Sequence, residues 1–524
     1  MRCSLASSIA VTCATVLALP VSLAAPAAAA VPSALGLPPA ATAQPPAPEL
    51  PGATQSLPLE PLDAGDRSLG GGTDDADVQG LTRRDVRPFS LVGVVWDDPT
   101  AALHGVVQVR TRATGGGAWS EWQDVETHNE EHGADPDTAE GHGRALKGST
   151  APLWVGDSDG VEIRVRGDEP LPEGLRLELV DPGEAPGGTP AQDPGQEPET
   201  TATPATAATE VAEATAVTAV TKASWSRTAA GSLALAGLSA AQAAVSGVNT
   251  QLAPFGSAWI PALSKEATEL TLPFAQAPHA APGEAQAPQA APHVIPDEAQ
   301  APDEVQAPAE AQAPEQLAAA KPYIGPRPKI ITRAGWGADE RIREKGFVYT
   351  KTIKAAFVHH SATGNNYTCA QAPSVLRSIY RYHVQSSGWR DFGYNFAVDK
   401  CGNIYEGRAG GVAKPVLGAH TLGFNTNSMG IAVLGTFTKS TPPAAVVTAV
   451  ARLTAWKLGL HGVNPKGSAY LVSGGGNLYK KGSTVKLNAI AGHRDGFATE
   501  CPGARLYGKL GTARTSSAKY QGRS

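Results

Sequence analysis

Apolar and polar residues alternate over short segments in the first half of the chain, a pattern typical of strands with one buried face. Turn residues separate these segments, and tryptophans add large apolar side chains among them. The segments are Phe89–Trp96, Val106–Arg112, Val161–Arg166 and Leu175–Val180. Short alternating strands predict a small β-sandwich-like accessory domain at residues 81–182.

In the second half, apolar strand-like runs alternate with amphipathic helical patterns. The predicted strands are Lys354–His359, Asn395–Asp399 and Met429–Leu434, and the predicted helices span Ser374–Gln385 and begin at Thr441. Thr441 can cap a helix, and the prolines that follow it suit a first turn. Strands that alternate with helices predict an α/β sheet domain at residues 322–512, followed by a tail at residues 513–524.

The first 30 residues have the pattern of a secretory signal. Arg2 is their only charge, an apolar run follows it, and Ala28–Ala30 offers a small-residue cleavage site. The alternative is a membrane anchor, but the apolar run is short for a span. The chain is therefore expected to be secreted, either extracellular or associated with a cell wall.

Two further segments have the composition of unfolded chain. Residues 31–80 are rich in Pro, Ala, Gly and Asp, which predicts disorder. Residues 183–321 form an Ala/Pro/Glu-rich stretch with a repeated Glu-Ala-Gln-Ala-Pro motif, which predicts a linker. Within it, Leu233–Val248 can form a helix, but its polar residues argue against a stable membrane span.

The formal net charge of −6 hides a contrast between the two parts of the chain. From Pro322 onward, 27 Lys and Arg face 8 Asp and Glu, a balance of +19, whereas the rest of the chain has a balance of −25. Charge contrast concerns partners rather than fold. A basic exported domain is expected to meet an anionic cell wall rather than nucleic acid. Attraction between the acidic linker and this domain is a further hypothesis.

Removal of residues 1–30 leaves three cysteines, Cys369, Cys401 and Cys501. Exported proteins usually pair their cysteines, so an odd one needs a reason. Cys369 and Cys401 can pair, which leaves the Cys501 thiolate for a metal. The alternatives are a free buried Cys501, or a disulfide that includes Cys501.

Two histidines and one cysteine form a candidate metal site. His359 or His360 at a strand end, together with His493 and Cys501, would give two nitrogens and one thiolate. This set holds Zn²⁺ and leaves a fourth position open for water, as in catalytic zinc sites. Adjacent strand residues face opposite sides, so only one of the two neighbouring histidines can be a ligand, and the spacing does not decide which.

Several motifs in the second half stand in a fixed order. They are His359–Ala362, Trp389–Phe396, Ile404–Arg408, Gly418–Thr421, Ser428–Ala432, Gly492–Asp495 and Cys501–Gly503. In this order they resemble the peptidoglycan recognition proteins and the related zinc-dependent N-acetylmuramoyl-L-alanine amidases. The resemblance covers about a third of the chain and implies a mixed β-sheet flanked by helices. The accessory domain resembles those attached to secreted actinobacterial wall enzymes.

The resemblance also implies roles for individual residues. It implies metal ligands at His359, His493 and Cys501, catalytic positions at Tyr394 and Thr499, substrate-binding positions at Arg408, His420 and Trp389, and a disulfide between Cys369 and Cys401. Thr499 stands where some phage relatives carry a lysine, so a lysine-dependent step is not expected. The implied enzyme is a monomeric zinc hydrolase that cuts the amide between N-acetylmuramic acid and L-alanine of peptidoglycan.

Two other functions compete with the amidase. One is a non-catalytic peptidoglycan-binding protein, but binding-only relatives typically lack the cysteine ligand that Cys501 supplies. The other is a glycosidase, which needs two carboxylates that flank a sugar bond. Glu406 has no obvious partner among the few acidic residues of this basic domain, so the glycosidase ranks last.

Overall fold

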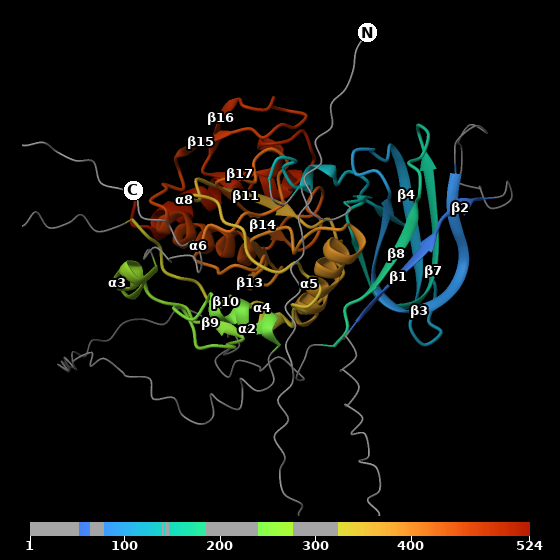
Figure 1. The fold of residues 1–524 in the computed structure, drawn as a ribbon, viewed down its shortest axis with the longest axis horizontal. Coiled ribbons are helices and arrows are strands. Elements are labelled where there is room, and N and C mark those ends of the chain that lie inside the picture. Colours follow the sequence, from blue (N-terminus) through green and yellow to red (C-terminus); the bar gives the residue numbers. More distant parts are fainter. Residues whose placement is uncertain (1–51, 63–77, 139–140, 142–145, 185–238, 276–322) are drawn as a thin grey trace, which may run out of the picture. The chain divides into compact units, whose positions relative to one another are not determined.

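The computed structural model describes residues 52–62, 78–138, 141, 146–184, 239–275 and 323–524 (Figure 1). All of them belong to one unit, Leu50–Ser524. The predicted signal at residues 1–30 lies outside the described residues, as does much of the predicted linker. None of the helices in the described part of the chain combines the length and apolar character that a membrane span requires.

The N-terminal domain is an eight-stranded antiparallel sheet with the order β1-β8-β3-β7-β4-β5, to which β2 and β6 add beside β3. The strands are β1 (Ala53–Pro58), β2 (Glu60–Pro61), β3 (Val78–Trp96), β4 (Gly105–Ala113), β5 (Gln123–Val125), β6 (Gly148–Ser149), β7 (Leu153–Gly167) and β8 (Arg176–Asp181). Alternate residues such as Val92, Val107 and Ile163 fill its core, as the sequence pattern predicted. Strand β1 lies within residues 31–80, so the prediction of disorder is wrong there.

The C-terminal domain is built on a mixed sheet with the order β17-β11-β14-β12-β13-β10-β9. Its strands are β9 (Trp259–Ile260), β10 (Ile330–Ile331), β11 (Ala355–His360), β12 (Phe396–Val398), β13 (Ile404–Glu406), β14 (Ser428–Val433) and β17 (Ile490–Gly492), and β15 (Ser468–Val472) pairs separately with β16 (Thr484–Asn488). Strand β11 runs parallel to both β14 and β17, whereas β12 and β13 are antiparallel. The predicted mixed sheet is confirmed.

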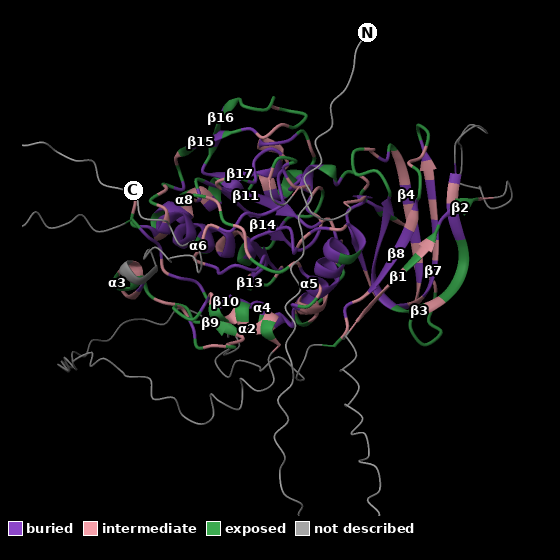
Figure 2. Ribbon diagram, viewed as in Figure 1, coloured by how far each residue is buried: buried purple, intermediate pink, exposed green. Residues whose placement is uncertain are grey.

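Helices cover both faces of this sheet. They are α2 (Ala240–Gly247), α3 (Lys265–Ala275), α4 (Arg333–Trp336), α5 (Ala372–Arg381), α6 (Ala444–Leu460), α7 (Ala504–Tyr507) and α8 (Leu510–Tyr520). Met429, Ile431 and Val433 of β14 pack with α6, whereas Ala432 packs with α5. Figure 2 shows the central strands and the covered sides of α6 as buried. The alternation therefore gives the sheet one face toward α6 and the other toward α5.

The predicted helix Ser374–Gln385 is confirmed, since α5 covers its first part and the π-helical turn Tyr382–Ser386 continues it. Two other predicted segments differ from the structure. The predicted linker contains α2, β9 and α3, because Ser239 caps α2 and β9 pairs with β10 at the sheet edge. The predicted tail is mostly helix α8, whose buried Ala513 and Ser517 pack toward α6.

The two domains share an apolar cluster. Leu91 and Trp154 of the N-terminal domain pack in one buried cluster with Ile379 and Tyr382 of the C-terminal domain. The Tyr382 hydroxyl also lies 3.0 Å from the carbonyl oxygen of Thr150. Trp154 is therefore a core residue of the contact between the domains.

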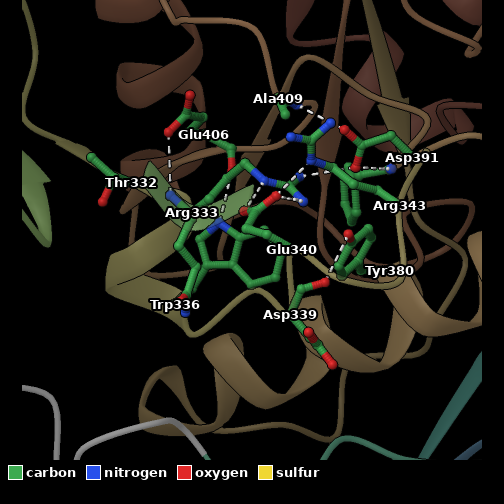
Figure 3. Close-up of polar contacts among 12 residues, drawn as sticks. Thr332, Arg333, Trp336, Asp339, Glu340, Arg343, Tyr380, Asp391, Glu406 and Ala409 are labelled. Carbon is green, nitrogen blue, oxygen red and sulfur yellow. Dashed lines mark hydrogen bonds and ion pairs between the residues drawn. The ribbon is translucent and has the colours of Figure 1, made fainter. Parts of the chain in front are cut away.

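A buried polar cluster lies where the C-terminal domain begins (Figure 3). The Arg333 side chain is fully buried and forms ion pairs with Glu340 at 2.6 Å and Asp391 at 3.1 Å. Glu406 is also buried and accepts hydrogen bonds from the Arg333 backbone N–H at 3.2 Å and from Asn249 at 2.9 Å. These contacts tie the segments before β11 to the sheet.

Candidate metal centre

Two adjacent parallel strands bring His359 and His493 together. In the pairing of β11 with β17, Val358 lies opposite Gly492, so the residues that follow them leave the same edge of the sheet. Val358 packs with the α6 side of the sheet, and His359 therefore points to the other face. The ring centroids of His359 and His493 are 4.5 Å apart.

Cys501 reaches the same point from the loop after the short 3-10 helix His493–Asp495. The Arg494 N–H donates a hydrogen bond to the Cys501 carbonyl at 3.0 Å, which folds this loop back on itself. The Cys501 sulfur lies 3.8 Å from Nδ1 of His359. Nitrogen and sulfur ligands of one tetrahedral zinc ion lie about 3.6 Å apart, so this spacing fits a shared ion.

A fourth donor comes from the other domain. His132 stands in a 3-10 turn, Glu130–His132, between β5 and β6. One ligand atom each from His132, His359, His493 and Cys501 all lie within 4.8 Å of one another. In this conformation the N-terminal domain therefore adds a further imidazole to the three expected donors.

The protonation states of these four side chains suit the binding of a metal cation. Among the described residues, neither ring nitrogen of His132 or of His493 has a hydrogen-bond partner, although both rings are buried. Burial lowers the pKa of His359 and His493 well below the usual range and that of His132 to about 4, so all three imidazoles are neutral. Burial raises the pKa of the Cys501 thiol, so a thiolate there requires a compensating cation. Three neutral imidazoles and one sulfur suit Zn²⁺.

Hydrogen bonds to neighbouring side chains orient His359. Nε2 of His359 lies 3.4 Å from the Thr421 hydroxyl, which in turn lies 3.0 Å from Nδ1 of His420. With Nδ1 of His359 turned to the sulfur, the proton belongs on Nε2, from which it can be donated to Thr421. His360, the neighbour on β11, instead accepts a hydrogen bond from the Phe437 N–H at 3.3 Å. Of the two candidate histidines, His359 is the one at the centre.

Tyr394 stands beside the donors. Its ring centroid lies 5.2 Å from that of His359 and 5.9 Å from that of His132. Burial raises the pKa of Tyr394 well above its ordinary value, so its phenol is protonated and can donate a hydrogen bond.

Thr499 lies between the cysteine and the N-terminal domain. Its hydroxyl accepts a hydrogen bond from the Cys501 N–H at 3.1 Å and donates one to the Glu131 carboxylate at 2.8 Å. Burial raises the pKa of Glu131 to about 7. In this conformation Thr499 therefore helps to hold the two domains together at the centre.

The three predicted substrate-binding residues are buried, each less than a tenth exposed. Arg408 donates to the Phe392 carbonyl at 3.3 Å, and the ring of Trp389 stacks on His383 with centroids 4.3 Å apart. His420 lies 5.4 Å from His359 between ring centroids. Their substrate contacts stay predictions. Cys369 and Cys401 form the predicted disulfide.

Sequence comparisons find relatives of both domains. The sequence profile for N-acetylmuramoyl-L-alanine amidase matches residues 349–504, and that for the Rv3811 N-terminal galactose-binding domain-like family matches residues 39–205. Peptidoglycan-recognition protein SC2 of Drosophila melanogaster is 30% identical over 183 residues, which are 35% of this chain and 85% of that protein. Human N-acetylmuramoyl-L-alanine amidase is 30% identical over 190 residues, 35% of this chain and 28% of that protein. The solved structure of wild-type Drosophila PGRP-LB aligns at 26% identity over 35% of this chain and 92% of that chain, with a TM-score of 0.28.

The fold and the shared sequence define a protein of the peptidoglycan recognition class. Through its C-terminal domain, the chain belongs to the family of peptidoglycan recognition proteins and N-acetylmuramoyl-L-alanine amidases, which confirms the resemblance found in the sequence.

Sequence reasoning missed the contribution of the N-terminal domain to the centre. The run His128-Asn129-Glu130-Glu131-His132 is the signal, since it gathers histidines and carboxylates in a loop between strands. The run is 227 residues before His359, and no spacing rule joins ligands so far apart in separate domains.

Proposed function

We propose that the C-terminal domain is a zinc amidase that hydrolyses the amide between N-acetylmuramic acid and L-alanine in bacterial peptidoglycan. The observation that carries this proposal is the meeting of His359, His493 and Cys501, which come from separate segments and form a zinc-type donor set. Relatives named for peptidoglycan recognition and for this amidase activity support the substrate class.

When bound, Zn²⁺ supplies Lewis-acid activation of water and of the scissile carbonyl. The residues of the chain supply orientation and hydrogen bonds. Thr421 fixes the ring of His359, and the protonated phenol of Tyr394 donates a hydrogen bond to the oxygen on which negative charge develops. One such donor commonly contributes about 3 kcal/mol to transition-state stabilisation.

The proposal includes export of the chain to the wall that it cuts. The disulfide between Cys369 and Cys401 supports an oxidising compartment, where such bonds persist. The excess of Lys and Arg from Pro322 onward suits an anionic wall polymer.

Substitution of a ligand tests the enzyme. In the full chain, Cys501→Ser and His493→Ala are expected to lose bound zinc and to abolish release of stem peptides from purified peptidoglycan, because each removes a donor of the proposed site. Elemental analysis gives the zinc content, and mass spectrometry of the soluble products identifies the bond that is cut. His104→Ala, which changes an exposed histidine of the N-terminal domain, is the matched control. Stem-peptide release by both ligand variants at the parent rate would contradict the proposal.

A second candidate function is peptidoglycan binding without catalysis. The fourth donor, His132, favours it, because four protein ligands are typical of closed structural zinc sites. Co-sedimentation of the chain with purified wall, with no new amine ends at any zinc concentration, would support binding alone.

A further inference from the structure

Residues 128–138 of the N-terminal domain, called the histidine segment from here on, lie against the candidate metal centre. They include the turn Glu130–His132. The space that remains between this segment, Tyr394 and Cys501 is a cavity of about 30 Å³. Sites for small ligands usually measure about 300–1,000 Å³, so no peptidoglycan fragment fits here while the segment is in place.

Directional hydrogen bonds hold the histidine segment on the C-terminal domain. The Leu422 N–H donates to the Glu131 carbonyl at 2.8 Å, and the Gly423 N–H donates to the Asp135 carboxylate at 2.6 Å. The side-chain amide of Asn425 also donates to Asp135, at 2.9 Å. Asp135 is buried, and these two donors take the place of the water that its carboxylate would bind in an undocked segment.

The position of His132 needs a cause, because its two ring nitrogens are buried without a hydrogen-bond partner among the described residues. An unsatisfied buried polar group commonly costs about 1–3 kcal/mol. The ring centroid of His132 lies 4.6 Å from that of His493, and one of its nitrogens falls within the donor set. A shared metal ion gives this nitrogen a partner and explains the burial.

We infer that the described conformation is a latent form of the enzyme, in which His132 is the fourth protein ligand of the metal and the histidine segment covers the substrate groove. This inference rests on the proposed function. Four protein ligands leave no position for the water that catalysis needs. Catalysis therefore requires the histidine segment to withdraw from the C-terminal domain, which frees one coordination position and opens the groove in the same movement.

The test compares three variants of the full chain loaded with zinc. His132→Ala removes the proposed ligand. Asp135→Ala keeps His132 and removes the carboxylate that docks the segment. It therefore tests the latent form even if His132→Ala fails to fold. His104→Ala changes an exposed histidine of the N-terminal domain outside this segment and is the matched control. X-ray absorption at the zinc edge counts imidazole ligands, chelator competition gives the zinc affinity, and purified peptidoglycan gives the rate.

His132→Ala is expected to lose one imidazole from the zinc shell and to weaken zinc affinity about tenfold or more. Its rate of stem-peptide release is expected to exceed that of the parent chain about tenfold or more, because a larger fraction of the molecules has the histidine segment withdrawn. Asp135→Ala is expected to change the zinc affinity and the rate in the same directions, and His104→Ala is expected to match the parent.

An unchanged imidazole count in His132→Ala and Asp135→Ala overturns the inference, and so does a lost imidazole without a gain in rate. Neither result decides whether the domain is an amidase, because Cys501→Ser reports on that separately. If no variant cuts peptidoglycan but His132→Ala loses an imidazole, the proposed function and the latent form both fail.

Discussion

Single buried residues of the C-terminal domain owe their ionisation mainly to desolvation. The imidazoles at the centre and the Glu406 carboxyl are all shifted toward their neutral forms by burial. Glu406 was the carboxylate considered for a glycosidase, but it is 1% exposed and its oxygens hold Asn249 and the Arg333 backbone. It supports the fold and cannot reach a sugar.

The stability of the chain should depend on pH through Glu406. Burial raises the pKa of Glu406 to about 7 from an ordinary value of 4.5. Between these values the folded state binds more protons than the unfolded state, so the contribution of Glu406 to the free energy of unfolding falls as pH rises from about 4.5 to about 7. Glu406→Gln should remove about 2–3 kcal/mol of this fall. Urea unfolding at a series of pH values measures it.

Glu121→Gln, at an exposed position of the N-terminal domain, is the control and should leave the pH profile unchanged. A Glu406→Gln profile as steep as that of the parent chain would show that another group causes the dependence.

Secondary-structure elements position the centre through strand register and through a buried ion cluster. The parallel pairing of β11 with β17 sets two ligands side by side, and α4 fixes the sheet edge through Arg333. Arg343 adds a second guanidinium 2.7 Å from Glu340 (Figure 3). Because these side chains are buried, each charge in the cluster is compensated by its partners rather than by water.

Arg333→Met should therefore destabilise the C-terminal domain by about 3–5 kcal/mol, since it leaves Glu340 and Asp391 buried with less compensation. Arg341→Met is the matched control, because Arg341 is 43% exposed and pairs with Asp339 near the surface. That variant should lose about 1 kcal/mol or less. Denaturant midpoints of both variants measure these losses of stability. Equal losses in the two variants would contradict the greater importance of the buried Arg333.

The sequence predicted the elements in which apolar residues follow a regular pattern. The strands around His359 and Met429 were found as continuous apolar runs, and the helix after Thr441 was found because its apolar residues recur at helical spacing. The segments β1 and β9 were missed because their composition resembles linker, and pairing with distant strands decides their structure. The family motifs located His359, His493 and Cys501. His132 could not be found, because only tertiary packing between domains brings it there.

At the scale of the whole molecule, the two domains behave as one unit through a shared core and through the centre. Tyr382 contributes to the shared core in two ways. Its ring fills the shared apolar cluster, and its hydroxyl lies 3.0 Å from the Thr150 carbonyl oxygen of the N-terminal domain. The domain contact is thus both apolar and directional, which suits a defined docked state.

Tyr382→Phe keeps the ring and removes the hydroxyl, so it should weaken the contact between the domains by about 1–3 kcal/mol, the cost of an unsatisfied buried carbonyl. Hydrogen exchange should then become faster in residues 146–154, which include Thr150, the partner of this hydroxyl. Tyr470→Phe, at a tyrosine that is 57% exposed, should leave exchange there unchanged. Equal protection in Tyr382→Phe and the parent chain would contradict this role.

The pairing of β9 with β10 has a consequence for the Ala/Pro/Glu-rich stretch. Residues 239–275 are bound to the C-terminal domain before residues 276–322 begin, through β9, through Asn249 on Glu406 and through Lys265 on the Ile324 carbonyl at 2.8 Å. The described residues on either side of 276–322 therefore belong to the same domain, whereas those on either side of 185–238 belong to different domains. A protease that nicks the chain once within 276–322 would leave the two fragments associated, whereas a nick within 185–238 would sever the peptide connection between the N-terminal domain and the C-terminal domain.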